Sequence, residues 1–404
     1  MNPGTLSMSS KQHCPICLFE FRASDRLARC RRGCTPTGTS TQSGPSESLI
    51  FDPRETGSSG RLPWSGTAAP KCPRCGAETA VWVCPSCKAD LPSEGASDEV
   101  VSMVGVGPAH AGKTTFLAMC AREVESHLGP LHGFVLDPWD REAQSVVGAL
   151  KAGKDLPSLL GAARAEDGWS GQPWRFRLLG AHPKRGESVW MSVFDTPGQA
   201  WEERDEAFLN AAQFVTSSRA LILILDPTRF GPVEAALRKR ESTHWSAQGA
   251  SRSSASAIAP ARRVSALDEI RHLSLFFGRR GVALPTQVAL AIVLTKLDSW
   301  ADLAPVGTLL HGLSQNPTEI PAGLDTTEFE QILHDETEAL LVEWSGESLT
   351  QQLDLKFPNY RCFAVSALGE AAHAPSEISA PAQPVGIDRV VRWVLAAQGL
   401  KVGT

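Results

Sequence analysis

The sequence of 404 residues predicts an α/β fold with a doubly wound, mostly parallel sheet, preceded by a small cysteine-rich module. From about residue 98 onward, short apolar runs alternate with amphipathic stretches, as in sheets whose strands are joined by helices. Eight of the ten cysteines fall in close pairs before residue 88. With 42% hydrophobic residues, the chain can bury at least one substantial core.

We expect two domains. Residues 11–92 form the cysteine-rich module, and its Ser-, Thr-, Gly- and Pro-rich stretch 35–70 is a flexible insertion. Residues 98–400 form the α/β domain, which carries an insertion at about 227–286 between its fourth and fifth strands. Within that insertion, residues 242–260 are mostly Ser, Ala and Gly and should be poorly ordered.

Dense apolar runs predict four buried parallel strands, at Val100–Val106, Ala220–Leu225, Val288–Leu294 and Arg361–Val365. Two further runs, Trp174–Leu179 and Val189–Phe194, predict an antiparallel hairpin at the edge of the sheet. Helical periodicity predicts helices at Thr114–Leu128, Pro138–Ala152, Glu202–Phe214, Pro232–Ser242, Val264–Phe277, Thr326–Trp344 and Ile387–Ala397.

The segment from Gly107 to Thr114 fits the phosphate-loop pattern GxxxxGK[ST], with a predicted strand before it and a helix after it. Glycines let consecutive backbone N–H groups point inward, Lys113 reaches the β and γ phosphates, and the Thr114 hydroxyl can bind Mg²⁺. The alternative is a glycine-rich turn without a ligand. The His110 side chain should point outward and has no catalytic role. The nucleotide-binding residues assigned here are Gly107, His110, Ala111, Gly112, Lys113, Thr114 and Thr115.

A second motif, Asp195-Thr-Pro-Gly198-Gln199, follows a predicted strand. A carboxylate delivered to the end of that strand can hold Mg²⁺ through water. Gly198, which lacks a side chain, can bring its N–H against a γ-phosphate, and loss of that phosphate would release the loop. An ordinary turn at the end of a strand is the alternative interpretation.

A third motif, Thr295-Lys296-Leu297-Asp298, predicts which base the pocket accepts. The Asp298 carboxylate can accept two hydrogen bonds from guanine, whereas adenine offers no such pair of donors. The stem of Lys296 would lie over the purine, and Thr295 would brace the phosphate loop. After a later strand, Ser366, Ala367 and Leu368 would bring backbone N–H groups to the guanine carbonyl oxygen.

In the order of these motifs, residues 100–398 resemble the translation-factor and Ras-like branch of P-loop GTPases. The resemblance implies GTP and GDP as ligands, with Mg²⁺, and a catalytic set of Lys113, Asp195 and Gln199, the last orienting the attacking water. The chain departs from the family because no threonine occurs between Phe116 and Phe194 to bind Mg²⁺. Ser158 is the nearest chemical substitute, so hydrolysis should be slow or dependent on a partner.

The close cysteine pairs predict metal binding. Two knuckles of this kind complete a four-sulfur zinc site, so two Zn²⁺ ions are expected, in closed structural sites. An iron–sulfur cluster is an alternative. In the simplest pairing the first two cysteine pairs share one ion and the last two share the other, and an interleaved pairing, with the first and third pairs joined, stays open. The expected ligands are Cys14, Cys17, Cys30, Cys34, Cys72, Cys75, Cys84 and Cys87.

The junction from Cys84 to Pro92, Cys-Pro-Ser-Cys-Lys-Ala-Asp-Leu-Pro, resembles that of the bacterial double-GTPase proteins, where zinc-ribbon knuckles precede the GTPase domain. This resemblance spans nearly the whole chain. It implies protein partners, among them a second GTPase, in a multi-protein bacterial system for signalling or defence.

The leading hypothesis is a GTP-binding molecular switch with slow or partner-dependent hydrolysis. The alternative is a hydrolysis-poor, nucleotide-loaded adaptor whose zinc module docks protein or nucleic acid. Residues 1–92 carry 11 Lys and Arg against 7 Asp and Glu, a margin that gives nucleic-acid binding weak support. The sequence lacks a long uncharged apolar stretch and the layout of a signal peptide, so we expect a cytoplasmic protein without a transmembrane segment.

Overall fold

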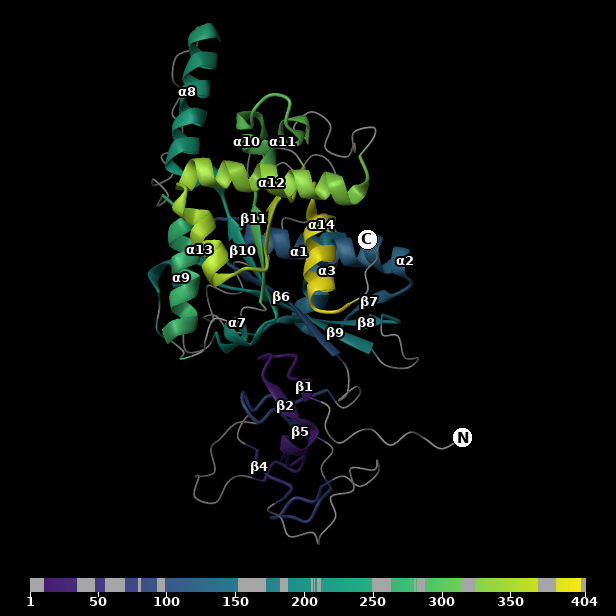
Figure 1. The fold of residues 1–404 in the computed structure, drawn as a ribbon. Coiled ribbons are helices and arrows are strands. Elements are labelled where there is room, and N and C mark those ends of the chain that lie inside the picture. Colours follow the sequence, from purple (N-terminus) through teal and green to yellow (C-terminus); the bar gives the residue numbers. More distant parts are fainter. Residues whose placement is uncertain are drawn as a thin grey trace.

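The computed structural model describes residues 11–34, 48–54, 70–78, 81–92, 99–151, 172–181, 188–204, 206, 208, 212–248, 263–279, 281, 288–313, 324–369 and 383–400. A large sheet with helices against it forms the upper part of the molecule, and the cysteine-rich segments lie below it (Figure 1).

Seven strands form the large sheet, in the order β12-β11-β10-β6-β9-β8-β7. Their bounds are β6 Glu99–Val106, β7 Val135–Pro138, β8 Trp174–Leu179, β9 Ser188–Asp195, β10 Ala220–Leu225, β11 Ala289–Leu294 and β12 Tyr360–Ala364. The pairs from β12 to β9 are parallel, and only β9 with β8 and β8 with β7 are antiparallel. The predicted mostly parallel α/β sheet is therefore confirmed.

The edge of this sheet differs from the prediction. β8 and β9 do pair antiparallel, but β9 also pairs with β6 on its other side, and β7 covers the outer side of β8. The prediction missed β7, which has four residues, ends in proline and begins with the exposed Val135. The hairpin is thus inside the sheet, and β7 is its edge strand.

Helices connect the strands. Their bounds are α1 Lys113–Glu123, α2 Gly129–His132, α3 Arg141–Lys151, α5 Gly198–Glu203, α7 Gln213–Ser217, α8 Gly231–Gln248, α9 Ala266–Arg279, α10 Leu297–Trp300, α11 Leu309–Leu313, α12 Thr326–Ser345, α13 Ser348–Lys356 and α14 Ile387–Ala397. A π-helical segment, η3 Val124–Leu128, joins α1 to α2, and short 3-10 turns lie at η4 Pro227–Arg229 and η5 Ala301–Leu303. Of the predicted helices, Ile387–Ala397 matches α14 at both ends.

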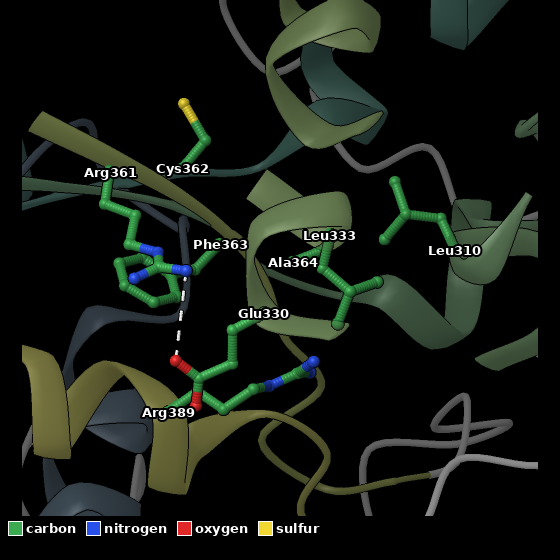
Figure 2. Close-up of a pocket in the computed structure, with 8 residues that line it drawn as sticks. All are labelled: Leu310, Glu330, Leu333, Arg361, Cys362, Phe363, Ala364 and Arg389. Atoms are coloured by element: carbon green, nitrogen blue, oxygen red, sulfur yellow. Dashed lines mark ion pairs between the residues drawn. The ribbon is translucent and has the colours of Figure 1, made fainter. Parts of the chain in front are cut away.

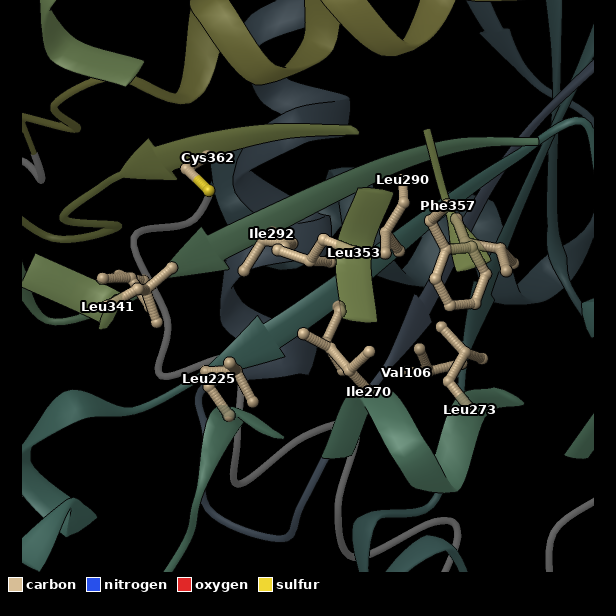
Figure 3. Packing of buried hydrophobic residues seen from close by; sticks show 14 of the residues in the cluster. Val106, Leu225, Ile270, Leu273, Leu290, Ile292, Leu341, Leu353, Phe357 and Cys362 are labelled. Carbon is tan, nitrogen blue, oxygen red and sulfur yellow. The ribbon is translucent and has the colours of Figure 1, made fainter. Parts of the chain in front are cut away.

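Both faces of the sheet are buried. Along β10, Leu221, Leu223 and Leu225 belong to one apolar cluster and Ile222 and Ile224 to the other, because successive side chains of a strand point to opposite faces. Residues of α9, α12 and α13 pack in the first cluster, and residues of α1, α3 and α14 pack in the second. Figure 3 shows part of the first, with side chains of α9 and α13 against those of β11.

Several element predictions were wrong. The single helix predicted at Glu202–Phe214 is broken, because α5 ends where Arg204 adopts a left-handed conformation with φ of 56°. The helix predicted to start at Pro138 begins at Arg141, where the Asp140 side chain accepts a hydrogen bond of 2.7 Å from the Ala143 N–H and caps it. Helix α13 was not predicted.

The two stretches predicted to lack structure are partly ordered. In the first, Ile50–Phe51 form β4, which pairs with β3. In the second, α8 continues through residue 248. The expectations for 35–47, 55–69 and 249–260 lie outside the described residues.

The cysteine-rich segments form two small sheets. β1 Lys11–His13 pairs with β2 Glu20–Arg22, which a 3-10 turn, η1 Ala23–Asp25, follows. β3 Leu27–Arg29 pairs antiparallel with β4 on one side and with β5 Val81–Val83 on the other.

The segment at the first cysteine knuckle contacts the large sheet. The Ser192 hydroxyl on β9 donates a hydrogen bond of 2.6 Å to the carbonyl of Pro15. In the last knuckle, Cys84–Cys87, the Ser86 hydroxyl donates to the side-chain carbonyl oxygen of Gln213 on α7 at 3.2 Å. Leu18 belongs to the first apolar cluster of the sheet. The knuckle is thereby joined to the strand that ends at Asp195.

Among the helices of the described residues, none has the length and apolar character that a membrane span requires.

Candidate functional site

The loop between β6 and α1 owes its curvature to two glycines. Gly107 has φ of 141°, and a Cβ at this residue would lie 2.2 Å from the carbonyl oxygen of Ile224 on β10. Gly112 has φ of 79° and caps the N-terminus of α1. Only glycine tolerates the first of these positions, because both its backbone conformation and its contact exclude a side chain. The loop therefore lies directly against the sheet. His110, at its outer turn, is exposed, as predicted for its side chain.

Lys113 lies inside the curve of this loop. Its side chain is buried, and its Nζ donates hydrogen bonds to the carbonyl oxygens of Gly107 at 2.9 Å and Pro108 at 2.6 Å. Burial lowers the pKa of Lys113 to about 8, although the nearby carboxylates of Asp195 and Glu202 act in the opposite direction. The ammonium group is thus held at the centre of the loop.

Thr114 and Asp195 meet beside the loop. The Thr114 hydroxyl donates a hydrogen bond of 2.6 Å to Oδ2 of Asp195, which is buried at the end of β9. The neighbouring Thr196 hydroxyl donates to the carbonyl of Gly105 at 2.8 Å and fixes the backbone there. A carboxylate and a hydroxyl side by side are the oxygen ligands that Mg²⁺ prefers, so these two residues fit that ion. Ser158, the substitute for the missing threonine, lies outside the described residues.

Gly198 packs against the same loop. A Cβ at this residue would lie 2.4 Å from Cα of Ala109 and 2.6 Å from Nζ of Lys113. Gln199 behaves differently: its Nε2 donates a hydrogen bond of 2.9 Å to Glu203 at the surface. The structure therefore brings Gly198 to the loop but does not bring the Gln199 amide to it.

Thr295 and Lys296 follow β11 and are fixed by contacts with neighbouring segments. The buried Thr295 hydroxyl donates to the carbonyl of Ala111 in the loop at 2.9 Å. Lys296 has φ of 57°, and its Nζ forms an ion pair of 2.5 Å with the buried carboxylate of Asp226, the residue after β10. The left-handed conformation of Lys296 thus turns the chain where the loop and two strand ends meet.

Asp298 has an exposed carboxylate that two serines orient. The Ser366 hydroxyl donates to Oδ1 of Asp298, and the Ser299 hydroxyl donates to Oδ2 at 3.1 Å. Ser366 in turn accepts a hydrogen bond of 3.0 Å from the Gly369 N–H. A single conformation of the carboxylate is favoured, with lone pairs still available to a ligand.

One cavity joins three of the sequence motifs. It has a volume of about 390 Å³, within the usual range for small-molecule sites. Its lining residues are Gly112, Thr115, Thr228, Thr295, Lys296, Asp298, Ser299, Ala367 and Leu368. The phosphate loop, the Thr295–Asp298 motif and the segment after β12 thus line the same cavity.

A second cavity, about 10 Å³ in volume, has space for only about one water molecule. Figure 2 shows Glu330 of α12 between Arg361 of β12 and Arg389 of α14, with the Glu330–Arg361 ion pair of 3.9 Å dashed. This cavity is too small to hold a nucleotide.

Four residues near the loop were not predicted: Asp226, Thr228, Glu202 and Arg229. Asp226 could have been found, because it directly follows a buried parallel strand, and ligands of such sheets bind at the carboxyl ends of strands. Its carboxylate accepts hydrogen bonds from the Thr228 N–H at 3.0 Å and from the Thr228 hydroxyl at 2.7 Å. Arg229 and Glu202 belong to no motif that the sequence presents.

The eight paired cysteines form two groups of four, and neither predicted pairing is correct. Cys14 and Cys17 lie with Cys84 and Cys87, and the remaining four cysteines form the other group, Cys30, Cys34, Cys72 and Cys75. The first pair is therefore joined to the fourth, and the second to the third.

The register of β3 and β5 explains this nested arrangement. Leu27 pairs with Val83 and Arg29 with Val81, so the two strands run antiparallel. Cys30 follows β3 and Cys84 follows β5, so they leave the sheet at opposite ends and cannot share an ion. Sequence spacing alone does not contain this information.

Both groups have the dimensions of a site for one metal ion. The Sγ atoms are 3.8 Å apart for Cys14 and Cys87 and for Cys17 and Cys84, and 3.7 Å apart for Cys30 and Cys75. Four thiolates placed about 2.3 Å from a tetrahedral Zn²⁺ would be about 3.8 Å apart. In an iron–sulfur cluster at least some of the four thiolates bind different irons and lie farther apart, whereas all four ligand atoms of each group here lie within 4.8 Å of one another. The residues therefore fit Zn²⁺.

No protein-family model matches the chain, and no curated protein matches it. Among solved structures it is similar to Methanosarcina barkeri Roco2 RocCORdC bound to GDP (12% identity, 75% of this chain and 51% of that chain, TM-score 0.26). It is also similar to the Saccharomyces cerevisiae Ski7 GTPase-like domain bound to GTP (12%, 75% and 51%, 0.28) and to the signal recognition particle receptor SRb-GDP from Chaetomium thermophilum (13%, 74% and 97%, 0.21). The chain spans about half of the first two structures.

Proposed function

We propose that this protein is a GTP-binding molecular switch that hydrolyses GTP slowly or only with a partner. The observation that carries the proposal is one cavity that Asp298 lines together with Gly112 of the phosphate loop and Thr115 of α1. A carboxylate fixed at one end of the cavity suits the two N–H donors of guanine, and the loop N–H groups suit phosphates at the other end.

The phosphates would lie along the loop from Gly107 to Thr115, with Lys113 as their counter-ion. Thr114 and Asp195 would hold Mg²⁺, which supplies charge neutralisation at the phosphates when bound. At the base, Lys296 would cover the purine while Ala367 and Leu368 bring N–H groups to the guanine carbonyl. The Ser366 N–H, predicted for the same role, instead donates to the carbonyl of Val385 at 3.1 Å.

The second candidate is a nucleotide-loaded adaptor with negligible turnover. Its support is the position of Gln199, whose amide is bonded to Glu203 at 2.9 Å rather than directed at the loop. A switch would have to break this bond to orient water. An adaptor would not.

In this proposal residues 11–92 act as a zinc module and residues 98–400 as the nucleotide domain. Closed four-thiolate sites leave no position for water, so the zinc ions would be structural and the module would dock a protein partner. The likeness of the Cys84–Pro92 junction to bacterial double-GTPase proteins suggests a second GTPase as that partner, in the cytoplasm. Nucleic acid is the alternative ligand of this module.

Equilibrium titration of the purified protein with GTP, GDP and ATP in the presence of Mg²⁺ tests the proposal. GTP and GDP should bind at least about a hundredfold more tightly than ATP, because a site built to hydrogen-bond the N–H groups of a ligand rejects an analogue that lacks them. Equal affinities for GTP and ATP would refute it. Single-turnover hydrolysis with and without cell extract then separates the switch from the adaptor.

A further inference from the structure

Arg229 reaches the phosphate loop from outside every recognised motif. It is the last residue of η4, the turn that Asp226 caps through its bond with the Thr228 N–H. Its backbone N–H donates to the carbonyl of Asp226 at 3.1 Å, and its own carbonyl accepts from the Val264 N–H at 3.1 Å. The backbone that carries this arginine is therefore fixed at both ends.

The guanidinium group of Arg229 is buried against the loop. The exposed fraction of its side chain is only 7%. One terminal nitrogen donates to the carbonyl oxygen of Ala109, and the other forms an ion pair of 3.2 Å with Glu202 on α5. Burial of a rotamer-rich cation at the surface of a phosphate loop needs a partner, and Glu202 provides it.

The same Glu202 oxygen also occupies a loop amide. Its Oε1 accepts a hydrogen bond of 3.0 Å from the Ala109 N–H. The amides of such a loop carry partial positive charge and need an anionic acceptor. A carboxylate oxygen on the Ala109 N–H therefore takes the place that a bound anion would take. Glu202 and a phosphate oxygen would therefore compete for this amide.

The position of this contact corresponds to the terminal phosphate rather than to the base. Ala109 is the loop residue that Gly198 touches, and Gly198 belongs to the motif whose N–H would meet a γ-phosphate. Lys113 is within electrostatic reach of both Glu202 and Arg229. The base end of the cavity, at Asp298, is lined by other residues.

We propose that Arg229 is a phosphate-contacting residue that the chain supplies in cis, and that Glu202 is the partner it exchanges for the terminal phosphate of the bound nucleotide. A terminal phosphate displaces the Glu202 carboxylate from the Ala109 amide, and the guanidinium fork then donates to phosphate oxygens. No covalent bond changes in this exchange. The inference rests on the nucleotide site proposed above and names how that site distinguishes a triphosphate from a diphosphate.

The test compares the affinity of each variant for GDP and for a non-hydrolysable GTP analogue. Arg229→Ala should lower the affinity for the analogue by about tenfold, the effect of one lost charge-assisted hydrogen bond, and should leave the affinity for GDP within about twofold of the wild-type value. Glu202→Gln should raise the affinity for the analogue by about threefold, since a neutral amide competes less well than a carboxylate for the Ala109 N–H and for Arg229.

Arg263→Ala is the matched control. Arg263 also pairs with a glutamate, its Nε lying 3.2 Å from Glu234, but its side chain is 74% exposed and the pair is at the surface. Both affinities should stay unchanged in this variant. If Arg229→Ala shows no cooperative melting transition, Arg229→Lys is measured in its place by the same criterion, because lysine keeps the charge but loses the fork.

If Arg229 had a purely structural role, its substitution would lower the affinities for both nucleotides equally. An unchanged ratio of the two affinities therefore overturns the inference. If the wild-type protein binds both nucleotides and that ratio does not respond to Arg229, only this inference fails. If the wild-type protein binds neither nucleotide, the proposed function itself fails.

Discussion

The hydroxyl of Ser366 donates a hydrogen bond to the carboxylate of Asp298, although 68 residues separate them in the sequence. The two residues lie after adjacent parallel strands, β12 and β11. Ser366 is buried, and its backbone also pairs with Val385 in both directions. The segment after β12 therefore orients the carboxylate that we assign to guanine.

Ser366→Ala should weaken GTP binding by about tenfold, because a hydrogen bond to a charged group is lost and Asp298 gains freedom. The affinity for ATP should change little. Isothermal titration measures both. Ser274→Ala, which removes a hydroxyl that donates to the Ile270 carbonyl within α9, is the control. A Ser366→Ala protein that binds GTP like the wild type would show that this contact does not orient Asp298.

The affinity for GTP should depend on pH through Lys113. Burial lowers the pKa of Lys113 to about 8, and a bound phosphate would raise it again. The contribution of the ammonium group to binding is therefore complete below about pH 8 and is lost as the pH rises above this value, by at most about tenfold per pH unit.

Binding near pH 8 should accordingly take up a fraction of a proton. Titration calorimetry in buffers of different ionisation enthalpy measures this uptake. Lys113→Arg is the control, because an arginine stays protonated in this range and its variant should take up none. Equal proton uptake by the two proteins would contradict the role given to Lys113.

Gly198→Ala should impair the response to the terminal phosphate. The added Cβ would lie 2.4 Å from Cα of Ala109 and 2.6 Å from Nζ of Lys113, so α5 or the loop must move. We expect a loss of at least about tenfold in affinity for a GTP analogue, equivalent to modest backbone strain. Gly148→Ala on α3 meets nothing within 4 Å and should leave binding intact. Normal analogue binding by the Gly198 variant would rule out the close contact.

The zinc content of paired cysteine variants tests the nested ligand groups. Cys14→Ser with Cys84→Ser removes two ligands from one group and should leave about one zinc ion per chain, whereas Cys14→Ser with Cys30→Ser affects both groups and should leave none. Elemental analysis of the purified proteins gives the answer. The reverse result would restore the pairing that follows sequence order.

The elements that could be predicted are those whose burial follows from the pattern of apolar residues in their own sequence. Ala220–Leu225 is apolar at every position and is a strand with those bounds, because it is covered on both faces. α14 was found at both ends for a similar reason, since its apolar residues recur on one face. β7 carries no such signal, because one of its four residues is an exposed valine and another is a proline.

What the sequence withheld concerns relationships between distant segments. The zinc ligands divide according to the antiparallel register of β3 and β5, which spacing does not encode. α5 ends at Arg204, which adopts a left-handed conformation. This conformation is uncommon for residues other than glycine, so an arginine in the sequence does not predict a helix end. Glu202 and Arg229 are ordinary surface residue types, and only the fold brings them 3.2 Å apart beside Ala109.

The most direct test of the guanine site exchanges the base for which Asp298 is suited. In xanthine a carbonyl replaces the exocyclic amine of guanine, so an amide side chain can donate where the carboxylate accepts. Titration of wild-type protein and Asp298→Asn with GTP and XTP should show a preference for GTP in the first and for XTP in the second, each by about tenfold or more. Retention of the GTP preference in the Asn variant would contradict the assignment of this cavity to guanine.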